Sequence, residues 1–197
     1  MTRVVLLAAL AAAAFAQPKT ENAKLQTRAV NGTLDASFRT IVSSQVEPAW
    51  IGYQVGQVSG ERSMCGTVSL EGAKEFVVLY RVASAQVEKI RTYAVDCTFD
   101  AGDLPLYWLT GVDGSQSALL LSTFIPPADA NKKGLEWQLA NSALSAIARH
   151  QDGAPALIDL ARRTQVSPQI RQEAVRWLGR SKDPRATKFF EEILAAR

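Results

Sequence analysis

Cysteine and histidine, the residue types that supply most zinc and redox sites, are scarce in this chain of 197 residues, which has 2 cysteines and one histidine. A structural zinc site takes four ligands, drawn mainly from these two types, so that class of site is excluded. A cysteine nucleophile with a histidine base is also disfavoured, because His150 has no carboxylate and nucleophile accompanying it in the sequence. We therefore expect no metal site, no cofactor and no catalytic residue.

A strong charge of one sign is also missing. Charged residues make up 21% of the chain and apolar residues 47%, which is close to the globular average and excludes both a disordered chain and a multi-span membrane protein. The net charge is −1 over residues 17–134 and +3 over residues 135–197. Nucleic-acid binding needs a clustered basic stripe, so we expect no nucleic-acid partner.

The start of the chain is typical of a secretory signal peptide. Arg3 precedes an apolar stretch of about 12 residues, which ends in the small residues Ala14 and Ala16. That stretch is too short to cross about 30 Å of hydrocarbon. We predict that residues 1–16 are a signal peptide cleaved after Ala16. The mature protein is then periplasmic or extracellular, without stable membrane insertion.

Export favours a disulfide between Cys65 and Cys97, because two thiols outside the cytosol are more often bonded than free. In the chain-entropy model this bond stabilises the fold by roughly 3–4 kcal/mol. A free buried thiol and a redox pair remain as alternatives. The spacing is far from the C-x-x-C of redox pairs, so a structural bond is preferred.

Residues 17–32 are polar and lack periodicity, and we predict a flexible lead-in there. Residues 33–127 are expected to form a small α/β domain that contains the disulfide. Its expected elements are a helix capped by Thr33, a strand over residues 50–55, a hairpin over 76–82 and 87–95, an edge strand over 104–109 and a helix capped by Asp113. In the first strand, alternation places Trp50 on one face and Tyr53 on the other. Pro105 is the reason for placing residues 104–109 at an edge. Residues 128–134 read as a linker.

From residue 135 onward the apolar period becomes 3.6 and an internal repeat is present. Residues 135–164 and 167–197 align at an offset of about 31 residues, which is typical of a stacked helix–turn–helix unit. The positions that align are Ala143, Leu144, Ile147, Ala148, Arg149 and Asp152 with Ala174, Val175, Leu178, Gly179, Arg180 and Asp183.

The second copy resembles the short HEAT-type repeat, the variety also found in phycobilisome lyases. The matching residues are Ile170, Arg171, Ala174, Trp177, Leu178, Gly179, Asp183, Pro184, Arg185 and Ala186. The first copy departs from the pattern, since Ala148 replaces the glycine and Gly153 the proline. The resemblance implies that residues 135–197 form an all-α HEAT-like helical repeat, a short α-solenoid. Together with the strands and helices expected in residues 33–127, the predicted fold class is an α+β N-terminal domain followed by this repeat.

The leading functional hypothesis is an exported, non-enzymatic HEAT-repeat protein that acts as a protein–protein interaction or scaffold module. The second helices of such repeats usually line the binding side, which offers Asp159, Arg162, Lys188 and Glu192 to a protein partner. Two repeats are one fewer than the roughly three of a free-standing array. Either the N-terminal domain therefore caps the first repeat, or the last helix meets another chain, which would be self-association through the last repeat.

Two alternatives belong to other functional classes. One is an enzyme with a site in the N-terminal domain around Trp50, Tyr53, Arg62 and Tyr80. The other, by analogy with the lyases, is a tetrapyrrole-handling or chromophore-handling protein. His150 is read as the cap at the end of a helix rather than as a catalytic base.

Overall fold

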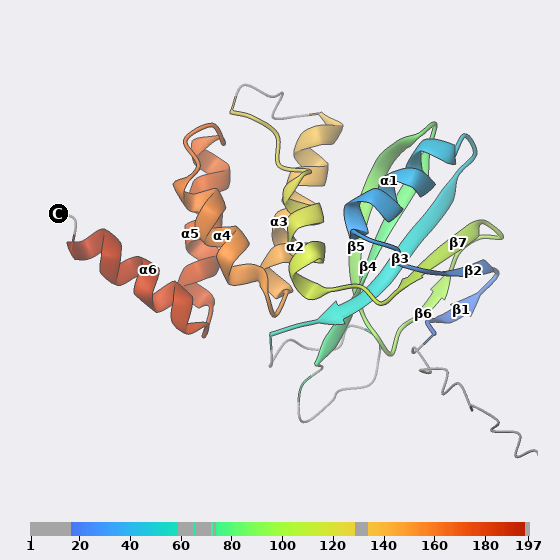
Figure 1. Ribbon diagram of the computed structural model, residues 1–197, viewed down its shortest axis with the longest axis horizontal. Helices are drawn as coiled ribbons and strands as arrows, with labels where there is room; N and C mark the ends of the chain where they lie inside the picture. The colour runs from blue at the N-terminus through green and yellow to red at the C-terminus, as the bar shows by residue number, and fades with distance from the viewer. Residues whose placement is uncertain (1–16, 59–64, 66–71, 73, 129–133, 196–197) are drawn as a thin grey trace, which may run out of the picture.

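The computed structural model describes residues 17–58, 65, 72, 74–128 and 134–195 (Figure 1). The predicted signal peptide, Arg62 and most of the predicted linker lie outside the described residues. The described part forms seven strands and six helices. The strands are β1 (Lys19–Glu21), β2 (Lys24–Ala29), β3 (Ala49–Gly56), β4 (Glu75–Ala83), β5 (Gln86–Ala94), β6 (Thr98–Asp100) and β7 (Pro105–Thr110). The helices are α1 (Leu34–Ser44), α2 (Gly114–Ser122), α3 (Leu135–Arg149), α4 (Gly153–Arg162), α5 (Pro168–Arg180) and α6 (Pro184–Ala195).

Five of the strands form a mixed sheet in the order β2-β7-β3-β4-β5. The pairs β2–β7 and β7–β3 are parallel, whereas β3–β4 and β4–β5 are antiparallel. The short strands β1 and β6 form a separate parallel pair. Helices α1, α2 and α3 lie against one face of the large sheet, and α4, α5 and α6 continue away from it (Figure 1).

The two faces of the sheet have separate cores because side chains alternate along each strand. The face beneath the helices buries Ile51, Tyr53, Phe76, Val78 and Tyr80, among others, in one cluster that continues into α3, α4, α5 and α6. The opposite face has a smaller cluster, built from Val77, Leu79, Ala94, Cys97, Phe99, Leu106 and Trp108. The predicted alternation along residues 50–55 is confirmed.

The end of α3 is hydrogen-bonded to the end of β3. The Val58 N–H donates to the Arg149 carbonyl oxygen, and the Gln151 N–H donates to the Gly56 carbonyl oxygen, each at 3.0 Å. The Arg149 guanidinium also donates to Thr92 Oγ1 of β5 at 3.2 Å. Backbone and side chain together therefore fix the third helix to the sheet.

The predicted fold class, an α+β domain followed by an all-α HEAT-like solenoid, is wrong. The chain has a mixed α/β fold, in which a five-stranded mixed sheet and the helices share a hydrophobic core. Hydrophobic periodicity reports which side of a helix is apolar and not what covers that side. The resemblance of residues 135–197 to HEAT-type repeats concerns the hairpins α3–α4 and α5–α6, and it stays a prediction.

Two smaller expectations in the N-terminal part are also corrected. The predicted lead-in 17–32 contains β1 and β2, which pair with β6 and β7. Most of β2 is exposed, and its pairing uses backbone groups, so its side chains carry no alternating pattern. The strand at residues 104–109 lies between β2 and β3 and not at the edge. Pro105 is tolerated there because it is the first residue of β7.

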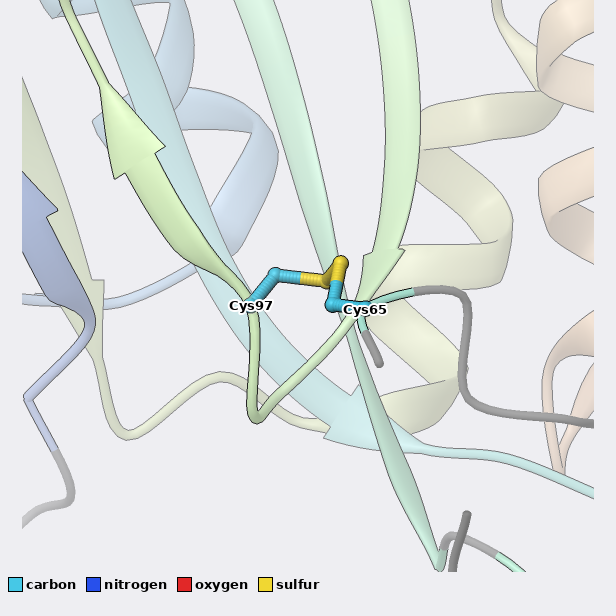
Figure 2. Close-up of a disulfide and its surroundings, with 2 residues drawn as sticks. All are labelled: Cys65 and Cys97. Atoms are coloured by element: carbon cyan, nitrogen blue, oxygen red, sulfur yellow. A yellow bond between two sulfur atoms is a disulfide. The ribbon is translucent and has the colours of Figure 1, made fainter. Parts of the chain in front are cut away.

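The predicted disulfide is present. Cys65 and Cys97 are bonded, with their Cα atoms 5.2 Å apart. Figure 2 shows the bond joining the connection between β3 and β4 to the segment that follows β5. Among the described residues, no helix is both long enough and apolar enough to cross a bilayer.

Candidate functional site

The four charged residues predicted to bind a partner lie on α4 and α6, and all four are exposed. Arg162 and Glu192 meet across the two helices, with 2.5 Å between Arg162 Nη2 and Glu192 Oε2. Asp159 forms an ion pair with Arg163, and Lys188 lies one residue before the buried Phe189 of α6. The structure therefore brings Arg162 and Glu192 together. Exposed pairs of this kind contribute little to stability, so both charges remain available to a competing partner.

A groove lies between α1 and α2. One part, of about 500 Å³, is lined by Thr33, Asp35, Gln116, Leu119, Leu120, Ser122, Thr123 and Arg163. An adjoining part, of about 420 Å³, shares Leu120 and Thr123 with the first and extends to Phe38, Val42, Val87, Phe124 and Leu139. We call these two parts together the α1–α2 groove.

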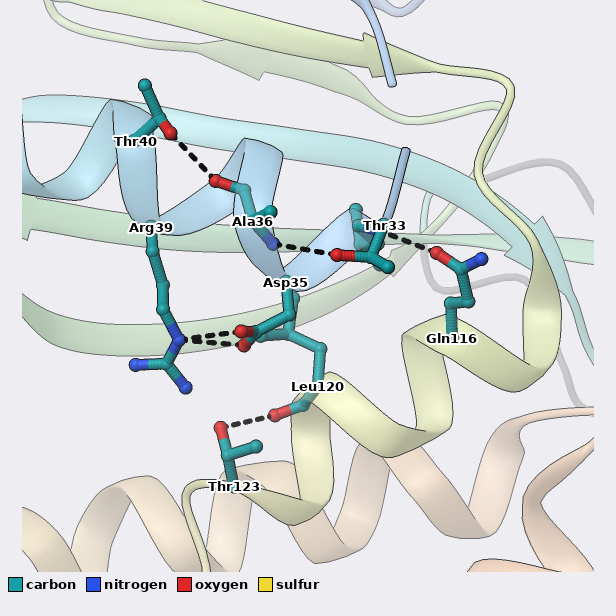
Figure 3. Close-up of polar contacts among 9 residues, drawn as sticks. Thr33, Asp35, Ala36, Arg39, Thr40, Gln116, Leu120 and Thr123 are labelled. Atoms are coloured by element: carbon teal, nitrogen blue, oxygen red, sulfur yellow. Dashed lines mark hydrogen bonds and ion pairs between the residues drawn. The ribbon is translucent and has the colours of Figure 1, made fainter. Parts of the chain in front are cut away.

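The polar groups at one end of this groove are engaged with one another (Figure 3). Thr33 caps α1 by accepting a hydrogen bond from the Ala36 N–H at 3.2 Å. The Leu34 N–H donates to Gln116 Oε1 of α2 at 2.7 Å, so one side chain of α2 completes the cap of α1. Thr123 Oγ1 donates to the Leu120 carbonyl oxygen at 2.8 Å. Of these contacts, the one between Leu34 and Gln116 joins the two helices, and the other two lie within one helix each. The buried side chains beneath the groove, Phe38 and Leu120, are apolar.

Charged side chains flank the groove on two sides. On α1, Arg39 Nε donates to both carboxylate oxygens of Asp35 at 2.8 Å. On the other side Arg163, the residue that caps the end of α4, pairs with Asp159. Arg163 lines the groove, and its ion-pair partner Asp159 is one of the four charged residues predicted to bind a partner. The groove therefore adjoins these four residues at α4.

Leu119 is the main apolar side chain that the groove leaves uncovered, with 66% of its surface exposed. It precedes Leu120 and Leu121, which are buried. One helix cannot turn three consecutive leucines toward the same core, so this run is the sequence signal for an outward-facing leucine. No local pattern in the sequence indicates the groove, because its walls come from segments far apart in the chain. The hydrogen bond from Leu34 to Gln116, for example, joins residues that are 82 positions apart.

Of the residues proposed for an alternative enzyme site, Tyr53 and Tyr80 are in contact in the core, whereas Trp50 lies apart from them. Tyr53 and Tyr80 are fully buried beneath the helices, where their hydroxyl oxygens are 2.7 Å apart and Ser117 Oγ donates to Tyr53 at 2.9 Å. Burial raises the pKa of Tyr53 to about 12, and burial together with the neighbouring Tyr53 holds the pKa of Tyr80 well above its ordinary value. Trp50 lies on the opposite face of the sheet, and Arg62 lies outside the described residues.

His150 ends α3 as its capping residue, as predicted, and its N–H donates to the Ala146 and Ile147 carbonyl oxygens. Its ring is buried and meets Phe76 edge-on, with 5.7 Å between the centroids. Desolvation lowers its pKa to about 4, despite the opposing charges of Asp152 and Asp113. The ring is therefore neutral at pH 7. Since Nδ1 accepts from the Asp152 N–H, the proton lies on Nε2.

Within the described ranges, no three histidine, cysteine, aspartate or glutamate side chains gather in a way that could hold a metal ion. Comparisons with models of protein families, with curated proteins and with solved structures find no match to this chain. Inference about function therefore depends on the chemistry of the surfaces described above.

Proposed function

We propose that the chain is an exported, non-enzymatic binding protein, which holds a segment of a partner protein in the α1–α2 groove. The observation that carries the proposal is Leu119, a leucine exposed over 66% of its surface beside a groove with an apolar floor. Burying such a side chain stabilises a complex by about 1.5–3 kcal/mol.

The composition of the groove favours a peptide segment as its occupant. Its floor offers apolar contacts, whereas Asp35 and Arg39 on one side and Arg163 on the other present charges of both signs. Apolar anchors surrounded by a polar rim are the usual arrangement of protein interfaces. The exposed charges of α4 and α6 extend this surface beyond the groove.

Export is part of the same proposal. The Cys65–Cys97 disulfide is compatible with an oxidising compartment, where such bonds persist. The disulfide therefore stays intact in the compartment where the protein would bind its partner.

Peptide selection tests the proposal directly. Random peptides displayed on phage would be selected on the purified, disulfide-bonded chain, and the affinity of each winner measured for Leu119→Asp and Leu194→Asp. These two leucines are matched, since Leu194 of α6 is 67% exposed. We expect Leu119→Asp to weaken binding by at least about ten-fold and Leu194→Asp to leave it unchanged. Equal effects of the two substitutions would contradict the proposal.

A second experiment tests whether the four exposed charged residues of α4 and α6 contact the partner. Charge reversal of Arg162 and Lys188 to glutamate is expected to weaken a partner that reaches from the groove onto α4 and α6. The effect should appear mainly in the association rate and should diminish at high salt. Binding that is undiminished at low salt would remove α4 and α6 from the interface.

A further inference from the structure

A second hollow lies on the face of the sheet opposite the helices, and it is lined by both cysteines of the disulfide that Figure 2 shows. Its volume is about 220 Å³, and the described residues that line it are Trp50, Cys65, Leu79, Tyr93, Cys97, Thr98, Phe99, Asp100, Ala101 and Leu106. Pockets for drug-sized ligands measure about 300–1,000 Å³, so this pocket suits a smaller molecule. We call it the disulfide-side pocket.

Three aromatic rings from three different strands line the pocket. Trp50 belongs to β3, Tyr93 to β5 and Phe99 to β6, and the rings of Tyr93 and Phe99 lie 5.7 Å apart at an angle of 56°. Trp50 and Tyr93 are only partly buried, so parts of both rings remain open to a ligand. The faces of such rings carry negative electrostatic potential, which attracts cations.

The charges around the pocket favour the same sign of ligand. None of the described lining residues is a lysine or an arginine, and one of them is Asp100. Residues 94–106 include three aspartates and no basic residue. In the β1–β6 pair, Glu21 is the register partner of Asp100 and Lys19 is the register partner of Thr98. Strand β1 therefore brings one charge of each sign to this edge, and the negative charge among the described lining residues comes from Asp100.

Strands β4 and β5 carry basic side chains on this face of the sheet, but none of them is among the described residues that line the pocket. Arg81 is paired with Glu88, with 2.6 Å between Arg81 Nη1 and Glu88 Oε2. Arg91, the cross-strand partner of Leu79, and Lys89, the cross-strand partner of Arg81, are both exposed on β5. Neither is among the described residues that line the pocket. The pocket itself therefore presents aromatic faces, sulfur and one carboxylate residue.

We propose that the disulfide-side pocket binds a small organic cation of the methylated ammonium class. Its methyl groups would contact Trp50, Tyr93 and Phe99, and its positive charge would be stabilised by the aromatic faces and by Asp100. A methylated ammonium is more easily desolvated than a bare one, because it has fewer or no N–H groups to leave unpaired in an apolar pocket.

The test compares two probes of the same shape on the full, disulfide-bonded chain. Choline carries the charge, and 3,3-dimethylbutan-1-ol replaces its nitrogen by carbon and is neutral. We expect calorimetric titration to give saturable choline binding, at least about ten-fold tighter than binding of the neutral probe. Equal affinities, or no saturable choline binding, would overturn the proposal without any variant being made.

Substitutions then locate the site. Trp50→Leu is expected to weaken choline binding about ten-fold, whereas Trp137→Leu on α3, at the opposite face, leaves it unchanged. Asp100→Asn should weaken it several-fold and reduce its dependence on salt. Tyr93→Leu serves as a second aromatic test if Trp50→Leu fails to fold. Choline binding that none of these pocket variants weakens would overturn the assignment of the site.

Discussion

The hydroxyl oxygens of Tyr53 and Tyr80 lie 2.7 Å apart in the core, and Tyr53 also accepts a hydrogen bond from Ser117. Tyr53 is thus the middle member of a buried row of three hydroxyls, contributed by β3, β4 and α2. This row joins the helix that forms one wall of the α1–α2 groove to the sheet beneath it.

Replacing the middle hydroxyl is expected to cost more than replacing an outer one. Tyr53→Phe leaves the hydroxyls of both Ser117 and Tyr80 without their partner, at about 1–3 kcal/mol for each buried group left unpaired. Tyr80→Phe removes a single contact and should cost less. Urea unfolding monitored by circular dichroism gives both values. Equal costs for the two variants would show that Tyr53 is not the centre of the row.

Stability should fall between about pH 6.5 and pH 4 because of His150. Its pKa is about 4 in the fold against an ordinary 6.5, so the unfolded chain takes up a proton in this range and the folded chain does not. The full contribution, about 3 kcal/mol, is present above pH 6.5 and is lost as the pH falls to about 4. This loss of stability is specific to His150, because His150 is the one histidine of the sequence.

The matching control is His150→Gln, which cannot titrate. The lowered pKa values of Asp113 and Asp183 act below their ordinary value of 3.8 and so outside this window. Unfolding free energies measured from pH 7.5 to pH 4.5 should therefore decline in the parent chain and stay nearly level in the variant. Parallel declines would assign the effect to other groups.

Removing the disulfide is expected to lower the free energy of unfolding. The bond joins residues that are 32 positions apart, for which the chain-entropy model gives about 3–4 kcal/mol. Replacing Cys65 and Cys97 together by alanine should reproduce the loss that dithiothreitol causes in the parent chain. The variant itself should not respond to dithiothreitol; a response would show that the reagent acts elsewhere.

Two glycines of the helical part should respond oppositely to alanine. Gly153 is the first residue of α4, and a Cβ there would collide with the Ile147 carbonyl oxygen of α3. Gly153→Ala is therefore expected to destabilise the fold by about 1–3 kcal/mol. At Gly179 in α5 a Cβ would meet only Phe190, at 4.0 Å, and Gly179→Ala is expected to stabilise by up to about 1 kcal/mol. Thermal melts of both variants check the signs.

The residue pattern was sufficient where local chemistry decides the structure. The cap at Thr33, the alternation of Trp50 and Tyr53, and the pairing of Cys65 with Cys97 were all predicted and are confirmed. The same alternation separates Trp50 from Tyr53 in space. It therefore already argued against grouping these two residues in one enzyme site.

The pattern was insufficient where distant segments meet. Strand β2 pairs through its backbone, which its exposed side chains do not encode, and the sheet packs on helices whose apolar faces were assigned to a separate solenoid. The α1–α2 groove likewise depends on contacts between segments far apart in the sequence, such as the bond from Leu34 to Gln116.

Site-specific photo-crosslinking in the source organism tests the central claim most directly. A photoreactive amino acid would replace Leu119 in the groove or, as a control, the exposed Gln172 of α5. The account predicts a discrete covalent complex with another protein from position 119 and none from position 172. Crosslinks of equal yield from both positions, or none from position 119, would contradict it.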